Sequence, residues 1–172
     1  MRQINEIIIH CTATQSNWRA GEKTSRKVAE VKLWHTRDRG WKDIGYHYLI
    51  DRDGTVAKGR PMDQIGAHVQ GHNTGTIGIS LFGGFGSAET DQFSDNFTLA
   101  QDKALRELLV KLRRDFPAIT KISGHNQYAA KACPGFNAPT WYANARGLAA
   151  QNPAPSFWIQ LIAAIMRLFK GK

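Results

Sequence analysis

The stretch SGHNQYAAKACPGF, residues Ser123–Phe136, organises the chain. It places His125 eight positions before Cys133, with Lys131 two positions before that cysteine. An imidazole and a thiolate on one loop are ligand types that zinc prefers. Two ligands do not complete a site, and the best third candidate, His10, lies near the other end of the chain. A metal site here competes with a simpler reading, a hydrogen-bonded core histidine and a buried cysteine.

His10 ends an apolar run, Glu6–His10, that contains three consecutive isoleucines. The run is β-branched and too short for a helix, so it predicts a buried strand. Neighbouring side chains on a strand point to opposite faces. If His10 faces a site, Cys11 therefore points away from it, and we interpret Cys11 as a small core residue.

The length and the cysteine content of the chain limit the kinds of protein that it can be. A chain of 172 residues is long enough to form one domain that buries most of its apolar surface without disulfides. Its two cysteines cannot form a disulfide framework in a domain of this size. No long apolar segment precedes Glu6, so we expect no cleavable secretory signal and folding in a reducing cytoplasm.

The net charge of +9 favours an anionic partner, which includes nucleic acid, an acidic polymer or a lipid surface. Charge alone does not choose among these partners, and a basic surface without a dedicated partner is an equally good interpretation. The chain carries none of the recognised nucleic-acid-binding motifs, so we expect no nucleic-acid partner.

The predicted order of elements is strand, helix, hairpin, strand, helix, strand. Asp53-Gly54 supplies the tight turn of the hairpin, and Thr98 with Gln101 forms a capping box before the clearest helix, which ends before Pro117. Strands alternating with helices predict an α/β fold, a single domain with a central mixed β-sheet flanked by helices. The expected elements after Glu6–His10 are the helix 25–39, the hairpin 44–56, the strand 77–82, the helix 98–116 and the strand 119–123.

Two further histidines lie among β-prone and loop residues. His47 has β-forming neighbours, and we interpret it as a hydrogen-bonded buried histidine. His68 lies in the loop Ile65–Gly75, which is dense in Gly, His and Asn, a composition found both at ligand sites and in ordinary surface loops.

The end of the chain differs from the rest. We expect a folded domain over residues 1–150, a stiff Pro-containing linker over 151–155 and a cationic amphipathic helix over 156–172. The apolar run of that helix is shorter than a membrane span. A wide apolar face edged by cations is typical of an interfacial membrane helix, so we expect Phe157–Lys172 to contact a membrane surface. Docking on the domain or on a second copy is the alternative.

Four longer motifs follow one another along the chain. They are IIIHCTAT (7–14), GWKDIGYHYLIDRDGTV (40–56), IGAHVQGHNTGTIGISLFGG (65–84) and GHNQYAAKACPGF (124–136). Taken together, these motifs resemble the zinc-dependent N-acetylmuramoyl-L-alanine amidases of the T7-lysozyme type, which are relatives of the peptidoglycan recognition proteins. The likeness covers nearly everything from Ile7 to about Trp141, with the motifs in the order of that family.

The resemblance implies a catalytic centre with one Zn²⁺ ion. By position, His10, His125 and Cys133 are implied as its ligands, and Tyr46 and Lys131 as the catalytic side chains. Recognising relatives without activity have usually lost the cysteine ligand, which this chain keeps. The loop that carries His68 and Asn73 is expected to border the substrate groove, with both residues binding substrate.

The resemblance also implies a biological role. It implies a monomeric peptidoglycan hydrolase that cleaves the amide between N-acetylmuramic acid and L-alanine. Its tail looks like those of some phage endolysins that act on Gram-negative hosts. Such an enzyme is made in the host cytoplasm and reaches the periplasm and cell wall through a pore made by a partner. The rival interpretation is a non-catalytic peptidoglycan-binding module.

Overall fold

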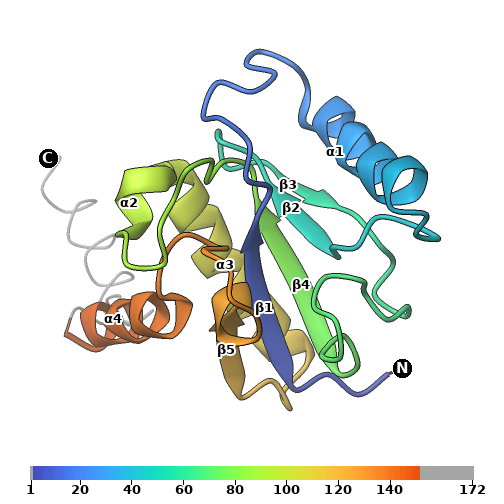
Figure 1. Ribbon diagram of the computed structural model, residues 1–172. Helices are drawn as coiled ribbons and strands as arrows, with labels where there is room; N and C mark the ends of the chain where they lie inside the picture. Colours follow the sequence, from blue (N-terminus) through green and yellow to red (C-terminus); the bar gives the residue numbers. More distant parts are fainter. Residues whose placement is uncertain (1, 152–172) are drawn as a thin grey trace, which may run out of the picture. The chain divides into compact units, whose positions relative to one another are not determined.

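The computed structural model of the protein describes residues 2–151, so residues 152–155 of the expected linker and the whole expected C-terminal helix lie outside them, while Gln151 belongs to a helix. Within these residues a five-stranded sheet has the order β3-β2-β4-β1-β5 (Figure 1). All neighbouring strands are parallel except β2 and β3, which form an antiparallel hairpin. The strands are β1 (Glu6–Cys11), β2 (Tyr48–Ile50), β3 (Val56–Lys58), β4 (Thr76–Leu81) and β5 (Lys121–Gly124).

Strand β1 has a partner strand on each side, β4 and β5. Its three isoleucines, Ile7, Ile8 and Ile9, are completely buried although they alternate between the two faces of the sheet. Both faces are therefore covered at this strand, as expected for parallel strands flanked by helices. The predicted α/β fold with a central mixed sheet is confirmed.

The helices follow the predicted order with two additions. Helix α3 runs behind the sheet, and α1 lies beside β2 and β3 (Figure 1). The short helix α2 and the helix α4 have no counterpart in the expected elements. The bounds are α1 (Thr24–Leu33), a π-helical turn η1 (Trp34–Asp38), α2 (Phe93–Asn96), α3 (Leu99–Asp115), a 3₁₀ turn η2 (His125–Gln127) and α4 (Ala138–Gln151).

Helix α3 begins as its sequence predicts. The Thr98 hydroxyl accepts the backbone N–H of Gln101, and the Gln101 side chain accepts the N–H of Thr98, so the capping box is formed. The amide of Gln101 also donates to the carbonyls of Ile50 and Phe82. One buried side chain thus caps the helix and fixes it against β2 and the end of β4.

A small apolar cluster joins α1 to β2. Val31 of α1 packs with Ile44, Leu49 and Phe82, all of them buried. After Leu33 the chain continues as the π-helical turn, so the expected single helix over 25–39 ends earlier than predicted as an α-helix. This turn carries His35 into the interior of the protein.

The first strand of the hairpin is shorter than predicted. Residues 44–47 lie outside β2. At Gly45 the backbone hydrogen-bonds away from the hairpin, where the N–H donates to His35 Nδ1 and the carbonyl accepts from the N–H of Ala67. The turn at Asp53-Gly54 is confirmed, with Gly54 at a φ of 88°. Among residues 2–151 no helix combines the length and apolar character needed to cross a bilayer.

Candidate active site

The sheet register brings two of the predicted ligands together. Strands β1 and β5 are parallel, and Ile9 pairs with Gly124. The residue after Ile9 and the residue after Gly124 are both histidines. His10 and His125 therefore emerge side by side at the carboxyl ends of two neighbouring strands. Their ring centroids are 4.8 Å apart.

The third residue, Cys133, arrives on the loop after β5. The backbone N–H of Asn126 donates to the Cys133 carbonyl at 2.7 Å, which folds this loop back beside His125. The Cys133 sulfur accepts the backbone N–H of Cys11 at 3.2 Å and lies 3.8 Å from Nδ1 of His10. The first strand and the closing loop therefore meet at this sulfur.

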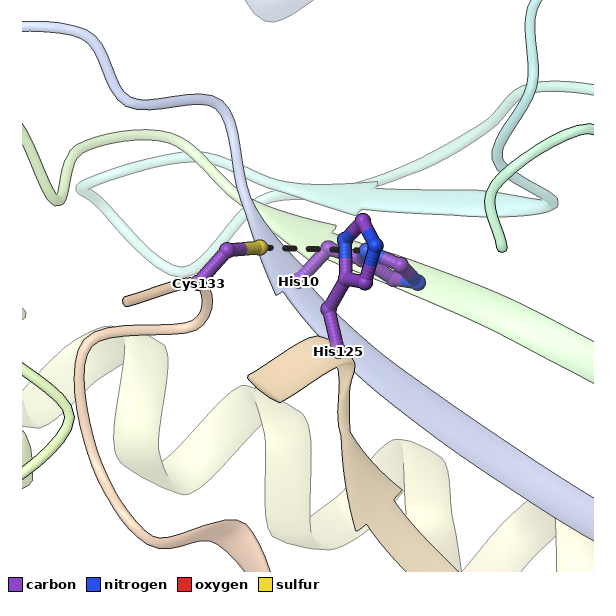
Figure 2. A group of neighbouring side chains, drawn as sticks. All are labelled: His10, His125 and Cys133. Atoms are coloured by element: carbon purple, nitrogen blue, oxygen red, sulfur yellow. Dashed lines mark hydrogen bonds between the residues drawn. The ribbon is translucent and has the colours of Figure 1, made fainter. Parts of the chain in front are cut away.

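These three side chains form a group that fits a metal ion. One ligand atom from each of His10, His125 and Cys133 lies within 4.8 Å of the others, and the side chains converge in Figure 2. Two imidazole nitrogens and one sulfur are the donor types of a catalytic zinc site, in which three protein ligands leave one position open. The residues present are suited to hold zinc.

Tyr46 lies against this group. Its ring centroid is 5.1 Å from that of His10, and it also packs edge-on against His35 at 5.3 Å. Burial, followed by the neighbouring thiols of Cys133 and Cys11, raises the pKa of Tyr46 above its ordinary value. The phenol therefore keeps its proton at neutral pH and is available as a hydrogen-bond donor.

Lys131 supplies positive charge at the same place. Its side chain is exposed, and its charge acts on both His10 and His125. Burial lowers the pKa of His10 well below its ordinary value, and the positive charges of neighbouring groups, Lys131 among them, lower it further. Burial and Lys131 also lower the pKa of His125. Both imidazoles are thus neutral, the form that binds a cation.

A cavity of about 800 Å³ opens beside the group. Cys133, His125, Tyr46 and Lys131 all line it, so the predicted ligands and the predicted catalytic side chains share one space. The lining also includes His35, Arg39 and Trp41, which the sequence did not single out as site residues. His35 belongs to the π-helical turn, and Arg39 and Trp41 follow it, so tertiary contacts and not a local pattern bring them to the cavity.

The two residues predicted to bind substrate also line this cavity, but both ring nitrogens of His68 and the side-chain oxygen of Asn73 are hydrogen-bonded within the protein. His68 is buried, with Nδ1 3.1 Å from Nε2 of His10 and Nε2 3.3 Å from the Thr76 hydroxyl. The Asn73 side-chain oxygen accepts the backbone N–H groups of His68 and Val69.

The remaining predictions concern Cys11 and His47. Cys11 is buried, as predicted, and its backbone N–H and carbonyl contact the Cys133 sulfur, while its side chain lies against Gly84. The neighbouring Cys133 lowers the pKa of the Cys11 thiol, and Cys11 raises that of Cys133. His47 is buried and hydrogen-bonded, as predicted, with Nδ1 accepting the N–H of Gly78.

Comparison with known proteins agrees with this geometry. A family model described as N-acetylmuramoyl-L-alanine amidase matches residues 1–136. The endolysin of Escherichia phage T7 is 39% identical over 136 residues, which are 79% of this chain and 83% of the endolysin. Peptidoglycan-recognition protein SC2 of Drosophila melanogaster is 33% identical over 142 residues, 78% of this chain and 70% of that protein.

A solved structure gives the same result. The endolysin N-acetylmuramoyl-L-alanine amidase LysCS from Clostridium intestinale superposes with a TM-score of 0.66 at 28% identity, covering 84% of each chain. The family model spans the chain from the first strand to the loop that carries Cys133. The chain therefore belongs to the N-acetylmuramoyl-L-alanine amidase family.

Proposed function

We propose that this protein is a zinc-dependent peptidoglycan hydrolase that cleaves the amide between N-acetylmuramic acid and L-alanine. The observation that carries the proposal is the convergence of His10, His125 and Cys133 beside a cavity that Tyr46 and Lys131 also line. Membership of the amidase family supports the choice of this bond.

In this proposal the three converging side chains hold one Zn²⁺ ion. Zinc in such a site supplies a Lewis acid that polarises the scissile carbonyl and activates water. The backbone N–H of Cys11 stabilises the sulfur of Cys133 in its charged, metal-binding form. His10 contributes Nδ1, the ring nitrogen that faces the sulfur.

In this proposal Lys131 stabilises the negative charge that develops on the substrate. Amide hydrolysis places negative charge on the carbonyl oxygen in the transition state. A preorganised ammonium group beside that oxygen stabilises it by an amount on the order of a few kcal/mol. Tyr46, which keeps its proton, is assigned as a hydrogen-bond donor to the water or to the same oxygen. His68 and Asn73 border the cavity in which the stem peptide or glycan would lie.

The names of the relatives support a role in lysis. The related phage proteins are called endolysins, and we propose that this chain likewise degrades the cell wall from inside a bacterial host. In this proposal it acts as a monomer, reaches the wall through a pore made by a partner, and uses residues 156–172 to disturb the membrane of Gram-negative cells.

Digestion of purified sacculi tests the proposal directly. The products are separated and the newly freed amino group is identified by mass spectrometry after labelling. The proposal predicts that label appears on L-alanine and that glycan chains stripped of peptide accumulate. Binding to sacculi without release of any amino group would make the protein a peptidoglycan-binding module. Release of another amino group would contradict the proposed bond.

A further inference from the structure

The imidazole of His68 is held in one position by its surroundings. Its ring lies between two glycines, and a Cβ atom added to either Gly66 or Gly78 would come within 2.5 Å of His68 Cδ2. Its backbone is fixed as well, because Asn73 Oδ1 accepts the N–H of His68 at 2.8 Å. A side chain in so close a fit cannot rotate toward a ligand without moving β4, which carries Gly78.

The fixed ring links the candidate metal group to the first residue of β4, Thr76. Nδ1 of His68 lies 3.1 Å from Nε2 of His10, the ring nitrogen that faces away from Cys133. Nε2 of His68 lies 3.3 Å from the hydroxyl of Thr76. The Thr76 hydroxyl in turn lies 3.0 Å from the carbonyl oxygen of His72. The four groups form one continuous hydrogen-bonded chain.

The carbonyl at the far end sets the direction of this chain. A carbonyl oxygen only accepts, so the Thr76 hydroxyl donates to His72 and its oxygen accepts from Nε2–H of His68. A neutral imidazole carries one ring proton, which leaves Nδ1 of His68 as an acceptor. That acceptor requires the ring proton of His10 to be on Nε2. Nδ1 of His10 is then left with its lone pair, facing Cys133.

We infer that His68 is a positioning residue of the metal site, which holds His10 in the tautomer and ring orientation that present Nδ1 to the ion, and that Thr76 anchors His68. The inference rests on the proposed function, and it replaces the role of His68 as a substrate contact. Hydrogen bonds from behind a ligating histidine typically change metal affinity by about 10–100-fold.

The experiment compares zinc affinity in matched variants of the full chain. His68→Leu removes both ring nitrogens, while His68→Asn keeps an acceptor near the place of Nδ1. We expect His68→Leu to raise the zinc dissociation constant about 10–100-fold, measured by competition with a chromophoric chelator. We expect His68→Asn to recover part of that loss. The visible spectrum of the cobalt-substituted protein should shift in His68→Leu, because the orientation of His10 changes.

His47→Leu is the control. His47 is also buried, and its Nδ1 accepts the N–H of Gly78, but it makes no hydrogen bond to His10. This variant should lose stability while keeping the zinc dissociation constant and the cobalt spectrum. If His68 contacted the substrate instead, His68→Leu would raise KM and leave the affinity for zinc unchanged.

Several results would overturn the inference. A folded His68→Leu variant with the zinc affinity and cobalt spectrum of the wild type would do so. Should His68→Leu not fold, Thr76→Val tests the same chain from its far end, and it must also weaken zinc binding. Unchanged affinity in that variant would overturn the inference while the proposed function stands. Wild-type protein that binds no zinc would overturn both.

Discussion

Among single residues, Cys133 is the one on which the proposed zinc site depends most. It is the group's only sulfur ligand, and the N–H of Cys11 already points at that sulfur. We predict that Cys133→Ser loses both zinc and hydrolysis, because a hydroxyl does not ionise as a thiol does. Metal analysis of the purified variant and a sacculus digestion measure the two losses. Cys11→Ser is the control and should keep its zinc.

A normal rate of sacculus digestion by Cys133→Ser would show that Cys133 is not a ligand. Zinc loss from Cys11→Ser as well would mean that the effect comes from damage to the fold around the two thiols.

A substitution of Lys131 tests whether metal binding and turnover depend on different residues. Its charge acts on His10 and His125, but its side chain is not a member of the ligand group. We predict that Lys131→Ala keeps one zinc per chain and loses about 10²–10³-fold in kcat, the usual effect of removing one group that stabilises an oxyanion. Single-turnover digestion and metal analysis check the two parts. Loss of zinc from this variant would contradict the division of roles.

His47 makes stability depend on pH. Burial lowers the pKa of His47 from 6.5 to about 4, so the unfolded chain binds a proton over that range and the folded chain does not. The contribution of the neutral His47 to stability is complete above pH 6.5 and is lost as the pH falls toward 4. We predict that, through His47, a fall in pH from 7 to 5 lowers the free energy of unfolding by about 2 kcal/mol.

Urea denaturation of His47→Asn and of the wild type at both pH values, with a chelator present, measures this contribution. The variant keeps an acceptor near the N–H of Gly78 and lacks the titrating group. An equal change in both proteins would contradict the prediction.

The sequence predicted the side chains of the site better than the contacts that hold them. His10, His125 and Cys133 stood out because imidazole and thiolate have a recognisable chemistry, and parallel pairing of β1 with β5 brings the two histidines together. The Cys11 N–H and the Asn73 amide oxygen act on their neighbours through the backbone. Backbone hydrogen bonds leave no pattern in the sequence, so these roles are visible only in the folded structure.

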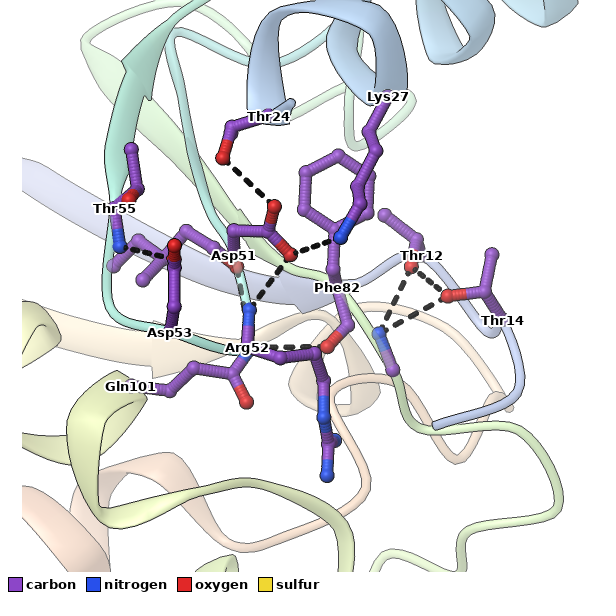
Figure 3. A network of polar contacts seen from close by, with 12 residues as sticks. Thr12, Thr14, Thr24, Lys27, Asp51, Arg52, Asp53, Thr55, Phe82 and Gln101 are labelled. Atoms are coloured by element: carbon purple, nitrogen blue, oxygen red, sulfur yellow. Dashed lines mark hydrogen bonds and ion pairs between the residues drawn. The ribbon is translucent and has the colours of Figure 1, made fainter. Parts of the chain in front are cut away.

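Among the elements, α1 is joined to the hairpin by a buried ion pair. Lys27 Nζ lies 2.9 Å from Asp51 Oδ1, and both side chains are less than a tenth exposed (Figure 3). The same carboxylate accepts the hydroxyl of Thr24 and the backbone N–H of Arg52. Asp51 directly follows β2, and Lys27 lies in the middle of α1, so the pair fixes the helix to the sheet.

We predict that Lys27→Met lowers the free energy of unfolding by about 3–5 kcal/mol, because it leaves the Asp51 carboxylate buried without its counterion. Urea denaturation measures the change. Lys103→Met is the control, since the ion pair of Lys103 with Glu107 on α3 is exposed and should contribute little. Equal stability of the two variants would contradict a structural role for the buried pair.

Elements with strong local signals were predictable, and those set by tertiary contacts were not. The capping box at Thr98 and the turn at Asp53-Gly54 are local, and both are present. The π-helical turn and the short β2 are not local, because His35 and Gly45 hydrogen-bond each other across ten residues of sequence. Helix α4, which begins at Ala138, has no counterpart among the expected elements.

In the whole molecule, the proposed division is between a catalytic domain, residues 1–150, and a tail, residues 156–172. The tail carries three Lys/Arg residues and no Asp/Glu. We predict that truncation after Asn152 spares the digestion of isolated sacculi, because every proposed site residue lies before it, and weakens the lysis of intact Gram-negative cells. Parallel turbidity assays on sacculi and on cells compare the two forms. Equal lysis of intact cells by both forms would contradict a membrane role.

We propose that one zinc ion is shared by the first strand and the loop after the last strand. Anomalous diffraction at the zinc edge, from crystals of the zinc-loaded protein, measures this most directly. We predict one peak among His10 Nδ1, a ring nitrogen of His125 and the Cys133 sulfur, at about 2.0–2.3 Å from each. A peak at other residues, or none among these three, would contradict it.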